Sequence, residues 1–165
     1  MGICIFRLPL GDDKATLTSS EIAAALSDRQ AEVAISIEVR NIADKRIELR
    51  ASNRGDAAAF GDGALTIDLQ VPAGSIAGVS QIAGFAGYET LCQTETLASA
   101  RPCSSLRANV VRLKANSWRP GDTAAVTFIV KNDPPSMIHA EAKSRISSTH
   151  ISTESLDLQL NYSEK

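Results

Sequence analysis

The sequence predicts a mostly-β protein, an immunoglobulin-like antiparallel β-sandwich of seven to eight strands preceded by a short strand–helix segment. From residue 33 onward, apolar and polar side chains alternate along several short runs, which is typical of half-buried strands. Gly, Pro, Asn and Asp separate these runs at short intervals. That spacing favours a two-sheet antiparallel sandwich over β-α-β units.

The first thirty residues have a different pattern. Residues 3–8 form a short apolar run, which suits a buried strand, and a polar loop follows. Thr18 and Glu21 have the spacing of a capping box, so a helix is predicted over residues 19–28. The predicted organisation is a strand–loop–helix segment, 1–30, and an Ig-like sandwich, 31–165.

Period-two alternation then predicts the sandwich strands and the side of each strand that is buried. The run 124–130 is the most apolar of them and is predicted to be central. The side chains predicted to lie inside are Val33, Ile35, Ile37, Ile47, Leu49, Leu65, Ile67, Leu69, Val126, Phe128 and Val130.

Composition excludes several classes of partner. The chain has 165 residues, with 17 Lys and Arg against 19 Asp and Glu, for a net charge of −2. This balance gives no electrostatic footprint for nucleic acid, and aromatic residues, at 4%, are too few for a base-stacking platform. No apolar run reaches the length of a membrane span, and the apolar start is too short for a secretory signal.

The three cysteines lack the Cys-x-x-Cys spacing of zinc or redox sites. Cys92 and Cys103 flank a short polar stretch and are a candidate disulfide, which would contribute roughly 3 kcal/mol to stability. That pairing requires an oxidising compartment. The alternative is two small, half-buried thiols, and the sequence leaves both open.

Catalytic and metal-binding signatures are weak. His139 and His150 are the only histidines, and both are interpreted as ordinary polar residues rather than metal ligands or the base of a Ser-His-Asp triad. The segment 78–82 lacks the second glycine of a nucleophile elbow. We therefore predict no enzyme activity, no cofactor and no metal.

Two short motifs are interpreted as turns. Gly61-Asp62-Gly63 lacks the third glycine of a dinucleotide-binding loop and precedes a strand rather than a helix. Arg54-Gly55-Asp56 has the letters of an adhesion tripeptide, but it lies at a strand end, where Gly and Asp are good turn formers.

The start of the chain, Gly2-Ile3-Cys4-Ile5-Phe6-Arg7-Leu8-Pro9, followed by a helix, resembles the last strand and helix of a (β/α)8 barrel. The β-rich part, with Val39-Arg40-Asn41 and residues 52–56, is similar to Ig-like accessory modules. Together they resemble the C-terminal end of an uncharacterised bacterial family in which a glycoside-hydrolase-like barrel precedes a β-sandwich. The resemblance implies an active site upstream of this chain and carries over no functional residue.

The favoured hypothesis is a non-catalytic accessory or interaction module of a larger bacterial protein. Its partner would be another protein or the upstream barrel, at the cell envelope or outside the cell if the whole protein is exported. The alternative is a carbohydrate-binding module attached to that barrel, with Trp118 and Tyr88 as ligand-facing aromatics and Phe85 more suited to the core. Residues 3–8 are expected either to join the sandwich or to form a homo-oligomer contact, because unpaired apolar strands associate.

Overall fold

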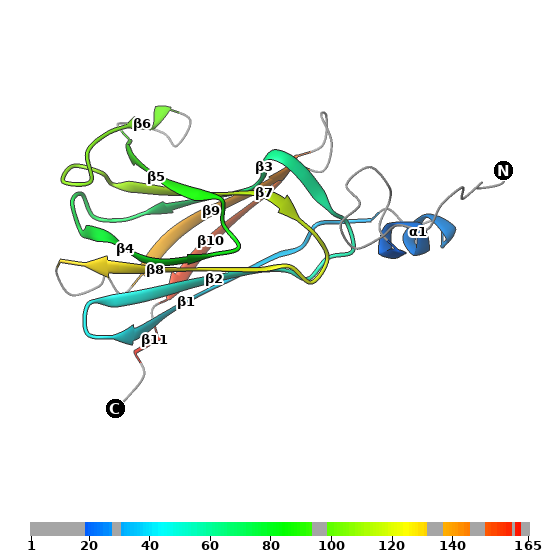
Figure 1. Cartoon of the computed structure of the whole chain (residues 1–165), viewed down its shortest axis with the longest axis horizontal. Coiled ribbons are helices and arrows are strands. Elements are labelled where there is room, and N and C mark those ends of the chain that lie inside the picture. The colour runs from blue at the N-terminus through cyan, green and yellow to red at the C-terminus, as the bar shows by residue number, and fades with distance from the viewer. Residues whose placement is uncertain are drawn as a thin grey trace.

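The chain folds into two packed β-sheets with one short helix at one end (Figure 1). The computed structural model describes residues 19–27, 31–93, 99–131, 137–145, 151–159 and 161–162. The elements are α1 (Ser19–Leu26), β1 (Ile35–Ala43), β2 (Arg46–Asn53), β3 (Ala59–Gln70), β4 (Ile76–Ala83), β5 (Gly87–Cys92), β6 (Arg101–Pro102), β7 (Val110–Trp118), β8 (Thr123–Val130), β9 (Met137–Arg145), β10 (Ile151–Gln159) and β11 (Asn161–Tyr162).

Sheet A has the strand order β11-β1-β2-β8-β4, and sheet B has the order β10-β9-β3-β7-β5-β6. The series β1-β2-β8-β4 opposite β10-β9-β3 has the order of the A-B-E-D and G-F-C sheets of an immunoglobulin constant-type sandwich. The extra strands β5, β6 and β7 are inserted between the fourth and fifth strands of that frame. The predicted fold class is therefore confirmed, although the described residues form eleven strands rather than seven or eight.

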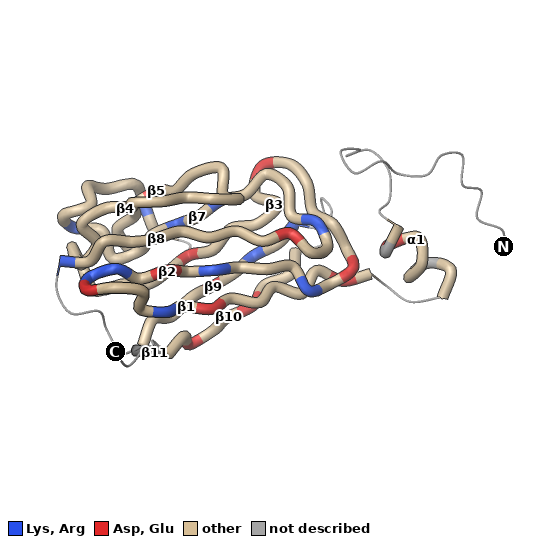
Figure 2. Tube along the Cα trace, turned by 60° about the horizontal axis from the view of Figure 1, so that its bottom comes forward, with Lys and Arg blue, Asp and Glu red and all other residues tan. Residues whose placement is uncertain are grey.

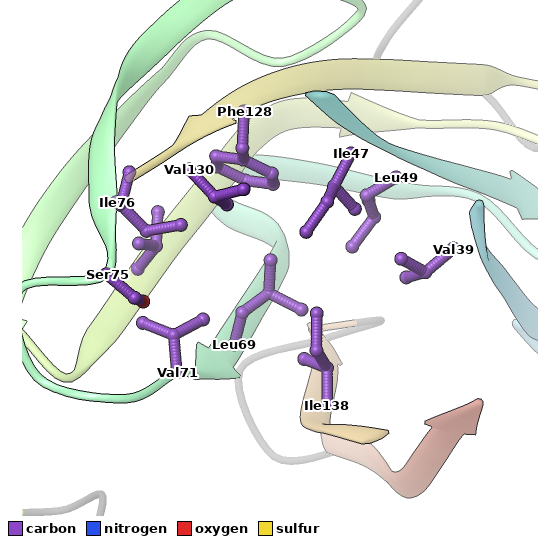
Figure 3. Close-up of a pocket in the computed structure, with 11 residues that line it drawn as sticks. Val39, Ile47, Leu49, Leu69, Val71, Ser75, Ile76, Phe128, Val130 and Ile138 are labelled. Carbon is purple, nitrogen blue, oxygen red and sulfur yellow. The ribbon is translucent and has the colours of Figure 1, made fainter. Parts of the chain in front are cut away.

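The core lies between the two sheets, and alternation along the strands determines which side chains enter it. All eleven side chains that the sequence places inside are buried. In Figure 3, Val39 and Ile47 of sheet A face Leu69 and Ile138 of sheet B across the interior. The cavity among these apolar residues measures only about 10 Å³, so the interior has no room for a ligand.

The helix α1 contacts one end of the sandwich. Ala24 is buried, and the Glu21 carboxylate accepts a hydrogen bond from the Ala58 backbone N–H at 3.1 Å. The predicted helix is confirmed over residues 19–26, whereas the predicted strand over residues 3–8 lies outside the described residues. In the part of the chain that is described, no helix has the length and hydropathy needed to cross a membrane.

The side chain of Asn53, at the end of β2, joins the two sheets and is only 2% exposed. Its Nδ2 donates to the carbonyl of Ala57 at 3.0 Å and to that of Trp118 at 3.5 Å, while its Oδ1 accepts from the N–H of Gly55 at 3.0 Å. The Asn53 backbone also exchanges hydrogen bonds with the turn 119–122. One amide thus fixes the end of sheet A against the start of β3 and the end of β7.

The first prediction concerns the core. Ile67 is fully buried at the centre of sheet B, so Ile67→Asp should cost about 4 kcal/mol or more and unfold the domain, because the carboxylate would have no partner. The matched control is Thr66→Asp on the outer face, beside Lys114 and Lys143. Circular dichroism and urea unfolding should show β structure for the control only. Two equally stable variants would contradict the assigned faces.

The second prediction concerns Asn53. Replacement by Ala leaves buried backbone groups without partners, so the free energy of unfolding should fall by about 1–3 kcal/mol. Urea unfolding measures the change, and Ser52→Ala, the neighbouring outward-facing position, should change it by less than about 0.5 kcal/mol. Equal losses for the two variants would show that Asn53 does not carry the junction.

Candidate functional site

Trp118 does not face a ligand. Its side chain is 1% exposed, and it pairs across β3 and β7 with Ala59, which is also buried. The sequence offered Trp118 as a ligand-facing aromatic because the chain has few aromatic residues. The strand continues through Trp118 before the chain turns, so the side chain points into the core, and the prediction is corrected.

Tyr88 is 44% exposed, but the structure gathers no aromatic platform around it. Phe85 is buried, as expected, and the guanidinium of Arg119 lies 5.6 Å from the ring centre of Phe60. Among the side chains whose exposure is described, Tyr88 is thus the only aromatic one that is well exposed. Sugar-binding faces usually stack a ligand on more than one such ring, and this face offers one.

The structure brings together three residues that the sequence did not connect. The Nδ1 of His139 in β9 lies 2.7 Å from Asp157 Oδ1, and its Nε2 lies 3.3 Å from Ser155 Oγ. These are the contacts of a Ser-His-Asp triad. The side chains lie on the open outer face of sheet B, where His139 is 38% and Asp157 67% exposed. Ser155 and Asp157 alternate along β10, and only the β9–β10 register places His139 beside them.

The Arg54-Gly55-Asp56 motif is a structural turn. Asp56 Oδ1 accepts the backbone N–H of Glu32 at 2.8 Å, and the Asp56 N–H donates to the Glu32 carbonyl at 2.9 Å. A Cβ atom at Gly55 would collide with the backbone at Glu32, so only glycine fits there. The carboxylate of Asp56 is therefore used to hold this turn in place.

Cys92 and Cys103 form a disulfide, with their Cα atoms 5.7 Å apart. The bond joins the end of β5 to the residue after β6. Next to it, Leu91, Ala108 and Val110 are buried, although they lie outside the cluster between the sheets. The disulfide and this small apolar cluster stabilise the β5–β6 edge, which the main core does not reach.

The outer face of sheet B neutralises its own charge. Asp68, although 2% exposed, accepts two hydrogen bonds from Arg112 at 2.6 and 2.7 Å. This hydrogen bonding to Asp68 raises the pKa of Arg112 above its ordinary value. Three further carboxylates on this face have partners: Glu89 with Lys114, Glu141 with Lys143, and Asp157 with the imidazole of His139.

The outer face of sheet A has a shallow hollow of about 440 Å³, called here the sheet A hollow. Its charged side is formed by β1 and β2, and its floor by the small side chains of β8 and β4. Register places Arg50, Ala125 and Ala83 in one row across three strands. The lining residues are Ser36, Glu38, Arg40, Glu48, Arg50, Ala51, Ser52, Gln81, Ala83, Thr123, Ala124 and Ala125.

Charges along the hollow form a chain of shared ion pairs. Arg50 donates to both carboxylate oxygens of Glu48, at 2.7 and 3.2 Å, and this hydrogen bonding raises the pKa of Arg50 above its ordinary value. Arg40 is held more loosely, 3.8 Å from Glu48 and 3.5 Å from Glu38. Arg54 lies 3.8 Å from the same Glu38. Each glutamate is thus shared between two arginines.

Arginine is in excess on this face. Four arginines, Arg40, Arg46, Arg50 and Arg54, stand against two glutamates, Glu38 and Glu48. Strands β8 and β4 carry no charged residue. Figure 2 shows the result, with basic and acidic residues along β1 and β2 and uncharged β8 beside them. The face carries surplus positive charge although the whole chain has a net charge of −2.

No group of three or more His, Cys, Asp or Glu in the described ranges is arranged to hold a metal ion. No protein-family model and no curated protein matches the sequence. Among solved structures, the chain is similar to the collagen binding subdomain of the Enterococcus faecalis surface protein ACE. The two share 7% identity at a TM-score of 0.43, over 76% of this chain and 94% of that chain. A likeness of this degree carries no inference about what the present chain binds.

Proposed function

We propose that this chain is a non-catalytic interaction module that binds an acidic polypeptide segment in the sheet A hollow. The observation that carries the proposal is the arginine surplus of the outer face of sheet A beside the uncharged floor of β8 and β4. The lining of the hollow itself has two arginines and two glutamates, and Arg46 and Arg54, outside the lining, supply the surplus. Guanidinium groups bind carboxylates in paired, directional contacts. The small residues let the backbone of a bound segment approach the sheet closely.

The two outer faces differ in a way that favours sheet A. On sheet B, Asp68, Glu89 and Glu141 each have a cationic partner within 2.8 Å, so these charges are paired within the face. On sheet A, Arg40 has only long contacts with its two glutamates, and Arg46 has no ion pair among the described residues. Surplus charge of one sign speeds the encounter with a partner of the opposite sign.

The Cys92–Cys103 disulfide supports a location in an oxidising compartment, because such bonds persist outside the cytoplasm. We propose that the module is part of a larger exported bacterial protein. The carbohydrate-binding alternative is less favoured, since Trp118 is buried and, among the side chains whose exposure is described, Tyr88 is the only exposed aromatic ring.

The third prediction tests the hollow with poly-L-glutamate as the probe. Titration into ¹⁵N-labelled protein should shift amide signals of β2 and β8 that line the hollow, and the shifts should vanish at high salt. Arg50→Glu should weaken binding roughly tenfold, because reversal removes one attraction and adds one repulsion. Ala125→Arg should also weaken it, because the long side chain occupies the floor.

Lys143→Glu makes the same charge change on the outer face of sheet B and should leave binding within about twofold. A glutamine polymer of the same length should produce no shifts. If Lys143→Glu weakens binding as much as Arg50→Glu, or if the shifts map to sheet B, binding follows net charge alone and the proposal fails.

The fourth prediction concerns Ser155. Acyl transfer needs an activated nucleophile and oxyanion donors in a site that excludes water, whereas His139 and Asp157 are solvated. A fluorophosphonate probe should therefore not label Ser155, and p-nitrophenyl acetate should be hydrolysed no faster by the wild type than by Ser155→Ala. Labelling that His139→Ala abolishes would show that the three residues work as a triad and would refute the non-catalytic assignment.

A further inference from the structure

In the described part of the chain, the outer side of the edge strand β1 is paired with another strand over only two residues. Beside the edge strand β1, the short strand β11 pairs in parallel with Arg40 and Asn41. Along Ile35–Val39, no described strand occupies that side of β1. Alternate residues of this stretch therefore direct their backbone N–H and C=O groups away from β2, into a position that no described strand fills, called here the vacant lane.

The facing strand of sheet B is under-covered at the same place. The inward side chains of β10 are Ser152, Glu154, Leu156 and Leu158, since they pair with the buried side of β9. Only Leu158 is buried, and Leu156 is half-buried against the core. A groove of about 480 Å³ separates the two edges, lined by Ile37, Glu38, Val39, Arg40, Asp157, Leu158 and Gln159. A strand in the vacant lane would cover the apolar side of β10.

We propose that residues 3–8 of the same chain fill the vacant lane as a strand antiparallel to β1. Alternate residues of this segment, Cys4, Phe6 and Leu8, are apolar and would face Leu156 and Leu158 of β10. Six residues of strand span about 20 Å, which matches the five open positions of Ile35–Val39.

The path of the chain supports its own N-terminal segment as the occupant. The helix α1 lies at the end of the sandwich where β1 begins (Figure 1). Ten residues, 9–18, separate the segment from α1 and can reach up to about 33 Å. Because the segment precedes α1, and α1 lies near the start of β1, a strand that runs along β1 toward α1 is antiparallel to β1. A tether this short gives an effective concentration on the order of millimolar, which favours the same chain over a second copy.

The fifth prediction tests the strand by hydrogen exchange. Amides of Ile35–Val39 that face the vacant lane should be protected in the full chain. Phe6→Asp should speed their exchange at least tenfold, because it places a charge against Leu156 and Leu158. The matched control is Ile5→Asp, the same change on the opposite face of the proposed strand, and it should leave that protection in place. Amides of β2 and β8 report whether each variant remains folded.

A spin label then identifies which copy supplies the strand. The double variant Cys4→Ser, Gly2→Cys allows a nitroxide to be attached at position 2, near the start of the segment. The nitroxide should broaden amide signals of β1 and β10 but not those of β4, which lies at the far edge of sheet A. In a mixture of labelled unenriched protein and unlabelled ¹⁵N protein, no broadening is expected. Broadening in the mixture would assign the lane to a second copy. Unprotected amides in the wild type, or equal effects of the two aspartates, would also overturn the proposal.

Discussion

The architecture depends on the buried amide of Asn53, which joins the sheets where core packing alone would let them slide. Hydrophobic contact between two sheets is non-directional, whereas the three hydrogen bonds of this side chain are specific for Ala57, Gly55 and Trp118. By fixing the end of β2, the amide also fixes the registers that β2 forms with β1 and β8. These registers place Arg50 beside Ala125 and determine which residues of β1 lie opposite each residue of β2.

The division between inner and outer faces explains why the candidate sites lie on the surface. The interior is consumed by aliphatic side chains, and its cavity is about 10 Å³. Each strand therefore packs one face into the core and directs the other face outward. On the outer face of sheet B, charged side chains form ion pairs with one another, and Asp68–Arg112 is the most buried of these pairs. Sheet A is the sheet whose outer face has surplus arginines and a shallow hollow, both of which a ligand could use.

Alternation was enough to predict the fold class and the buried side of the strands, because one buried face imposes period two on residues such as Ile35, Ile67 and Val126. It could not predict the burial of Trp118, because the period-two pattern of Val111, Leu113 and Ala115 would place Trp118 on the opposite face, and β7 changes phase before it. The alternation was weak over β4, because residues 73–87 are rich in Gly, Ala and Ser. The sheet A hollow was missed because Arg50 and Ala125 lie far apart in sequence and meet only through register.

The edges of the sandwich show a consistent asymmetry. An exposed edge strand invites association, and proteins commonly disrupt it with bulges, short strands or covering segments. The edge strand β4 has two register irregularities, and the opposite edge of sheet B ends in the two-residue β6, stabilised by the disulfide at Cys92. At the other side, the regular stretch Ile35–Val39 and the nine-residue β10 have no such device among the described residues. Two of the four sheet edges are thus disrupted, and the other two face each other across a groove that Ile37, Val39 and Leu158 line together with charged and polar side chains. A regular edge beside such a groove has the features of an edge that receives a strand.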